Sequence, residues 1–139
     1  MRKQLVALVG LGLLLATSSA YSQTLRPVKA NIPFPFVVEK TLLPAGQYVV
    51  TSAGLFGGAI TIQSLDRKVS KMVLPNACQS DKVADVTKLV FHRYGDHYFL
   101  SQIWRAGNDI GKEMPTSPRE TELAMSSPGQ SVVVVATLR

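Results

Sequence analysis

Short apolar runs alternate with turn-forming residues along most of the chain, which predicts an all-β protein. Runs rich in Val, Ile, Phe, Tyr and Thr recur about every ten residues, with Gly, Pro, Asn and Asp between them. We expect an antiparallel meander of seven to eight strands that forms a small barrel or a sandwich. The expected strands are 28–34 with an irregular continuation to 38, 47–52, 59–65, 69–74, 88–94, 97–104 and 131–138.

The most specific turn signal is Gly95-Asp96, which separates two aromatic strands and suits a type II′ hairpin turn because glycine comes first. With these two residues in the turn, Tyr94 pairs with His97. Because side chains alternate between the faces of a strand, this register predicts two faces. The core face should carry Leu89, Phe91, Tyr98, Leu100 and Trp104. The opposite face should carry Val90, His92, Tyr94, His97, Phe99 and Ile103.

This opposite face is too apolar to be fully exposed, and two interpretations remain open. A short helix can cover it, since Ser117 suits an N-cap, Pro118 suits the first turn and Glu120 completes a capping-box pattern, which predicts a helix near 118–125. Alternatively, the face binds a ligand or partner. The candidate residues for that surface are His92, Tyr94, His97 and Phe99.

The C-terminal run 132–136 consists of four valines and an alanine without polar alternation. Such a run predicts a strand that is buried on both faces. An exposed edge of this composition would favour aggregation, so the strand needs partners in the folded protein. The expected partners are the first strand, around 28–32, or the hairpin strand that ends at Trp104.

The first 22 residues have the pattern of a secretory signal. Arg2 and Lys3 precede the apolar run 5–16, and small residues follow it up to Ser22. The apolar run is shorter than the roughly 20 residues that a membrane-spanning helix needs, so we expect cleavage after Ala20 or Ser22 and no stable membrane anchor. The remaining part, 23–139, is then exported to the periplasm or the extracellular space as a single β-rich domain.

The charge of the exported part is mildly positive. Without Arg2 and Lys3 it carries 13 basic and 9 acidic residues. Basic and acidic residues are interleaved between 66 and 93, whereas a nucleic-acid-binding protein usually gathers its cations on one face. We therefore expect no nucleic-acid partner, while an anionic polymer of the envelope remains a possible partner.

The chain has a single cysteine, Cys78, so an intramolecular disulfide is impossible. The surrounding residues 75–80 predict a loop, from which Cys78 is a candidate for an intermolecular disulfide in an oxidising compartment. The alternative is a partly buried thiol that acts as a small apolar side chain.

The sequence lacks a recognisable catalytic or metal-binding pattern. His92 and His97 share a predicted face, but two imidazoles are fewer than the three protein ligands typical of a catalytic zinc site, so we expect no metal and no cofactor. The segment 107–113 is one residue too short for a phosphate-binding loop. Neither histidine has an evident nucleophile paired with it. We therefore expect a protein that is not an enzyme.

Three motifs stand out along the chain: Asn31-Ile32-Pro33-Phe34-Pro35-Phe36, Leu43-Pro44-Ala45-Gly46-Gln47-Tyr48, and the segment from Lys88 to Leu100. Together they resemble those of a family of small exported β-rich bacterial proteins without an assigned activity. The resemblance implies export and a β fold, and it implies no catalytic residue. Pro35 stands where that family's pattern has an acidic residue.

These observations lead to one expected function and two alternatives. The expected function is a non-catalytic exported domain that binds a protein partner or a surface polymer. The first alternative is a small barrel that carries an apolar ligand in an internal cavity lined by Phe91, Tyr98, Leu100 and Trp104. The second is an exported hydrolase without a recognisable motif.

Overall fold

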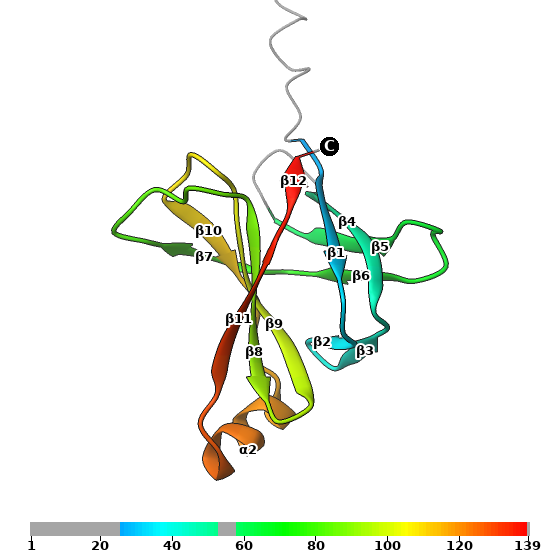
Figure 1. Cartoon of the computed structure of the whole chain (residues 1–139), viewed down its shortest axis with the longest axis vertical. Helices are drawn as coiled ribbons and strands as arrows, with labels where there is room; N and C mark the ends of the chain where they lie inside the picture. Colours follow the sequence, from blue (N-terminus) through cyan, green and yellow to red (C-terminus); the bar gives the residue numbers. More distant parts are fainter. Residues whose placement is uncertain (1–25, 53–57, 139) are drawn as a thin grey trace, which may run out of the picture.

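A computed structural model describes residues 26–52 and 58–138 of the chain. The predicted signal peptide, 1–22, lies outside the described residues. The described part contains twelve strands in two sheets and one short helix, α2 (Pro118–Ser126) (Figure 1). The predicted all-β fold with one short helix near 118–125 is therefore confirmed. No helix in the described ranges has both the length and the apolar character needed to cross a membrane.

The two sheets form a sandwich and do not close into a barrel. The first sheet has the order β12–β1–β4–β5–β6, made of β12 (Thr137–Leu138), β1 (Val28–Ile32), β4 (Gly46–Ser52), β5 (Ile60–Ser64) and β6 (Ser70–Val73). The second has the order β11–β8–β9–β10–β7, made of β11 (Gln130–Val135), β8 (Lys88–Tyr94), β9 (His97–Trp104), β10 (Ile110–Glu113) and β7 (Asn76–Gln79). A small hairpin of β2 (Phe36–Val38) and β3 (Thr41–Leu43) joins β9 through one parallel pair, Val37 with Phe99.

The described chain passes between the two sheets four times, before and after the β2–β3 hairpin and at two bent segments. β6 continues through Leu74 and Pro75 into β7, and β11 continues through Ala136 into β12 (Figure 1). Strands that bend in this way form the corners between packed sheets. The bend at Ala136 divides the predicted strand 131–138 into β11 and β12, which explains part of the difference between twelve observed and seven or eight expected strands. The segment that bends after β6 extends strand structure into 75–80, which places β7 where the sequence predicts a loop.

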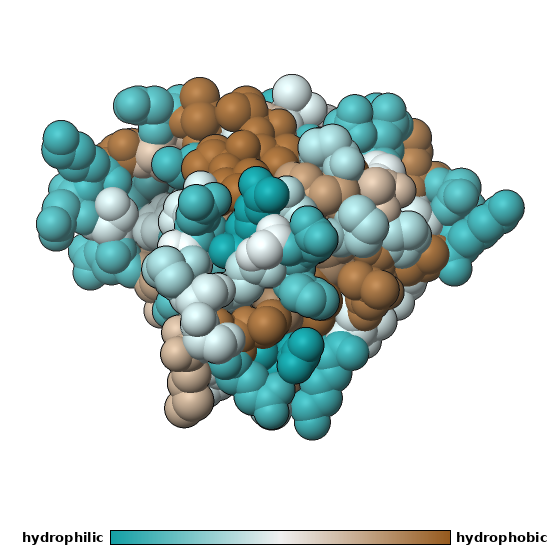
Figure 2. Space-filling view, turned by 60° about the horizontal axis from the view of Figure 1, so that its bottom comes forward, coloured by the Kyte–Doolittle hydropathy of each residue, from teal (hydrophilic) through white to brown (hydrophobic). Residues whose placement is uncertain are grey.

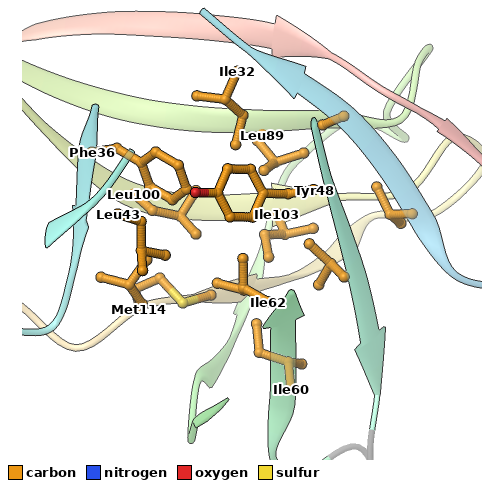
Figure 3. Packing of buried hydrophobic residues seen from close by; sticks show 14 of the residues in the cluster. Ile32, Phe36, Leu43, Tyr48, Ile60, Ile62, Leu89, Leu100, Ile103 and Met114 are labelled. Atoms are coloured by element: carbon orange, nitrogen blue, oxygen red, sulfur yellow. The ribbon is translucent and has the colours of Figure 1, made fainter. Parts of the chain in front are cut away.

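Side chains from both sheets fill the space between them (Figure 3). Phe36 of β2 lies edge-on to Tyr48 of β4 and to Phe91 of β8, with ring centroids 5.1 and 5.5 Å away. The fully buried Tyr48 donates its hydroxyl hydrogen bond to the carbonyl of Pro44 at 2.6 Å. Since a buried hydroxyl needs a partner, the turn before β4 is part of what stabilises the core.

A β-bulge in the β8–β9 hairpin changes the predicted faces far from the turn. The bulge leaves Ser101 unpaired, so that Leu89 lies opposite Ile103. Because one extra residue reverses the alternation of the strand, Ile103 points into the core and Trp104 to the outer face, opposite to the prediction. Trp104 therefore lies on the other side of the sheet from Phe91, and these side chains do not line a common cavity.

The valine run is not buried on both faces, so that prediction is wrong. Val133 and Val135 are 51% and 63% exposed, whereas Val132 and Val134 pack against the core. β11 is the edge of its sheet and has only one face toward the core. Its partner is β8 rather than the expected β9, while β12 pairs with the first strand, β1, as expected.

Candidate functional site

The helix α2 contacts the outer face of the β8–β9 hairpin near its turn. The predicted register is confirmed here, with Tyr94 opposite His97 and His92 opposite Phe99. Glu120 of α2 places its Oε1 3.0 Å from Nδ1 of His92 and 3.5 Å from the hydroxyl of Tyr94. Burial, with the nearby Glu120 carboxylate, raises the pKa of Tyr94, so the phenol stays protonated and donates to the carboxylate.

Local sequence explains why a helix begins at this place. The side chain of Ser117 accepts a hydrogen bond from the backbone N–H of Glu120 at 3.2 Å, and Pro118 occupies the first turn. In a complete capping box the Glu120 side chain would return to the backbone of Ser117. The Glu120 side chain points instead to the β8–β9 hairpin, where its carboxylate contacts His92 and Tyr94.

The four candidate residues share one face but differ in how they can be reached. Tyr94 and Phe99 are buried, with 8% and 3% of their surface exposed. His92 is partly covered by its contact with Glu120, and His97 is exposed. A binding partner can therefore reach His97 directly and Phe99 only through a neighbouring opening.

That opening is a groove of about 340 Å³, which we call the α2 groove. It lies between the β2–β3 hairpin, β9 and the start of α2. Figure 2 views the molecule from the α2 end and shows its hydrophobic residues as separate patches surrounded by hydrophilic ones. The groove is lined by Val37, Glu39, Lys40, Leu42, His97, Phe99, Ser117, Pro118 and Arg119.

The α2 groove combines apolar walls with basic side chains. Leu42 is 68% exposed, and together with Val37, Phe99 and Pro118 it forms a contiguous apolar surface in the groove rather than a single exposed side chain. Lys40 and Arg119 add positive charge, and Glu39 adds a negative charge that is paired with Lys71, outside the groove, at 3.5 Å. Arg119 lies 3.1 Å from Glu122, but both side chains are exposed and such pairs are weak.

Sequence reasoning missed the contribution of the β2–β3 hairpin to this groove. A usable signal exists in the adjacent pair Leu42-Leu43. Neighbouring residues of a strand point to opposite faces, so a three-residue strand cannot bury both leucines in the same core. Leu43 is buried and Leu42 is exposed, as this rule requires. The pairing of β2 with β9, which brings Leu42 near α2, has no such local signal.

Cys78 lies in the edge strand β7, opposite Gly111, rather than in the predicted loop. It is half-buried. Burial, followed by the nearby carboxylate of Glu113, raises the pKa of the Cys78 thiol. A raised pKa lowers the fraction of thiolate at neutral pH and slows thiol chemistry. The intermolecular disulfide stays a prediction.

We predict that Glu120→Ala lowers the free energy of unfolding by about 2 kcal/mol, because it leaves His92 and Tyr94 without their shared acceptor. Urea denaturation followed by circular dichroism measures the change. The matched control is Glu122→Ala on the same helix, whose exposed carboxylate pairs with the equally exposed Arg119. Equal unfolding midpoints for the two variants would show that the Glu120 contact contributes nothing.

The polar side chains that line the α2 groove are those of Glu39, Lys40, His97, Ser117 and Arg119. Ser117 is the only hydroxyl residue among its described lining residues, and its oxygen is occupied by the Glu120 N–H. In the described ranges, 26–52 and 58–138, no three His, Cys, Asp or Glu residues are grouped as metal ligands. Comparison of the chain with protein-family models, curated proteins and solved structures gives no match.

Proposed function

We propose that this protein is a non-catalytic exported domain that binds a protein partner through the α2 groove. The observation that carries the proposal is the exposed Leu42 beside the recessed Phe99, in a groove with room for a large side chain. Apolar or aromatic anchors that enter such recesses contribute most of the affinity of many protein interfaces. The basic residues Lys40 and Arg119 favour a partner whose anchor is flanked by acidic residues.

A protein partner fits this groove better than a surface polymer does. Val37, Leu42, Phe99 and Pro118 form mostly apolar walls, which do not satisfy the hydrogen bonds of a hydroxyl-rich or phosphate-rich chain. Export is part of the same proposal and is supported by the N-terminal pattern that ends near Ser22. The resemblance to exported β-rich bacterial proteins supports it as well.

The test compares two aspartate substitutions of exposed apolar residues. Leu42→Asp places a charge in the groove, whereas Met72→Asp on β6 is its control, since Met72 is 62% exposed and lies outside the groove. Each purified protein is immobilised and exposed to envelope and secreted material of the producing cells. We expect a protein captured by the wild type and by Met72→Asp, with at least tenfold less captured by Leu42→Asp.

Two results would contradict the proposal. The first is equal capture by all three proteins, which would place any binding surface elsewhere. The second is capture that survives digestion of the extract with a protease, which would identify a polymer instead of a protein. Circular dichroism spectra of the two variants establish that both are folded before the comparison is made.

A further inference from the structure

A second cavity lies between the two sheets, far from α2, and its walls are aliphatic. Strands β1, β4 and β5 contribute Val28, Val50 and Ile60 on one side, and β9 contributes Ile103 on the other. All four belong to the buried core. The space has a volume of about 250 Å³, and each of these four side chains is at most 6% exposed. We call this space the inter-sheet cleft.

Two cations line the same cleft. Lys112 of β10 lies opposite Ile103, so its side chain is on the core side of the sheet, where lysine is rare. Arg105 directly follows β9 and is partly buried. No Asp or Glu is among the described residues that line the cleft. The cleft therefore presents positive charge next to an apolar interior.

Arg105 has an incomplete set of partners among the described residues. One of its N–H groups, at Nη1, donates to the backbone carbonyl of Arg26, and no carboxylate in the described ranges forms an ion pair with it. Burial lowers the pKa of the Arg105 guanidinium, which reflects the cost of removing this charge from water. A guanidinium that keeps N–H groups unused is suited to bind a carboxylate through two parallel hydrogen bonds.

We propose that the inter-sheet cleft binds a small amphipathic carboxylate, such as a medium-chain fatty acid. The alkyl chain lies between Val28, Val50, Ile60 and Ile103, and the carboxylate contacts Arg105 at the mouth with Lys112 beside it. The volume is below the range of roughly 300–1,000 Å³ that is usual for drug-sized ligands, which favours a short chain. This site is separate from the α2 groove, so either proposal can fail without the other.

Binding of octanoate to the purified full chain, measured by isothermal titration calorimetry, tests the proposal. We expect saturable binding that is at least tenfold tighter than binding of octanol, which lacks the charge. Hexanoate should bind about tenfold more weakly than octanoate, because two fewer methylenes are buried. Absence of saturable octanoate binding, or equal affinity for octanol, would overturn the proposal.

Arg105→Gln should weaken octanoate binding at least tenfold. Its matched control is Arg93→Gln, since Arg93 also donates to a backbone carbonyl, that of Gly95, but lies outside the cleft. A second pair of variants changes exposed residues, so that a loss of binding cannot be attributed to unfolding around a partly buried side chain. Ile110→Asp, at a 60% exposed position lining the cleft, should weaken binding about fivefold at low salt, and Met72→Asp should leave it unchanged. Equal effects within each pair would contradict the assignment of the site.

Discussion

A chain that ends at Gly129 should fail to fold. The truncation removes β11, which pairs with β8 along six residues, and β12, which pairs with β1. It also removes the core contacts of Val132 and Val134 and the buried Ala136. Val132 and Val134 are partly buried, so each contributes less than the roughly 1.5–3 kcal/mol of full burial, but the lost backbone hydrogen bonds of β11 and β12 add to this, and the total loss is several kcal/mol. This is comparable with the roughly 5–15 kcal/mol by which a domain is stable.

Size-exclusion chromatography and a thermal transition followed by circular dichroism measure the effect of this truncation. A soluble monomer with a cooperative transition close to that of the full chain would show that the segment is dispensable. A finer comparison separates the two faces of β11. Val134→Asp should destabilise strongly because the side chain packs on the core, whereas Val133→Asp should be tolerated at its exposed position.

Gly111→Ala should lower the free energy of unfolding by about 2 kcal/mol or more. A Cβ atom at Gly111 would lie 2.7 Å from Cε3 of Trp104 and 2.9 Å from the carbonyl oxygen of Ile103. The carbonyl belongs to the paired backbone of β9 and cannot move alone, so the indole and the strand must shift together. Overpacking of this kind typically costs 1–3 kcal/mol. Urea unfolding followed by the fluorescence of Trp104, the single tryptophan, measures the change.

The control for this substitution is Gly58→Ala. An added Cβ at Gly58 would meet no atom within 4 Å among the described residues. Alanine at such a position should leave stability unchanged or raise it slightly, because it restricts the unfolded chain. Equal unfolding midpoints for the two variants would mean that the close contact of Gly111 with Trp104 is not a constraint.

The motifs 31–36, 43–48 and 88–100 contribute side chains to one core rather than to one binding site. Ile32 and Phe36 come from the first motif, Tyr48 from the second, and Leu89 and Phe91 from the third, and all five are buried in the same cluster. Their recognisable spacing thus reflects strand alternation and the turn before Tyr48. The α2 groove and the inter-sheet cleft use other residues for most of their lining, which is why the motifs alone predict a fold and not a ligand.

The sequence by itself determined those features whose causes lie within a few residues. Gly95 has a φ of 61°, which the first position of a type II′ turn requires, and the hairpin register follows from it over the next residues. Ser117 and Pro118 likewise determine where α2 begins. In both cases the backbone conformation is decided by the side chain or the missing side chain at the turn itself, so a local pattern is sufficient.

Only the tertiary structure decided how the strands are shared between the two sheets. The bulge at Ser101 exchanges the faces of Ile103 and Trp104. The valine run pairs with β8 at an edge of its sheet, where Val133 and Val135 face outward. Such changes depend on contacts between residues far apart in the sequence. A shift of one residue moves every side chain beyond it to the opposite face of the sheet. Both proposed binding sites lie where distant strands meet, so their residues become neighbours only when the sandwich has formed.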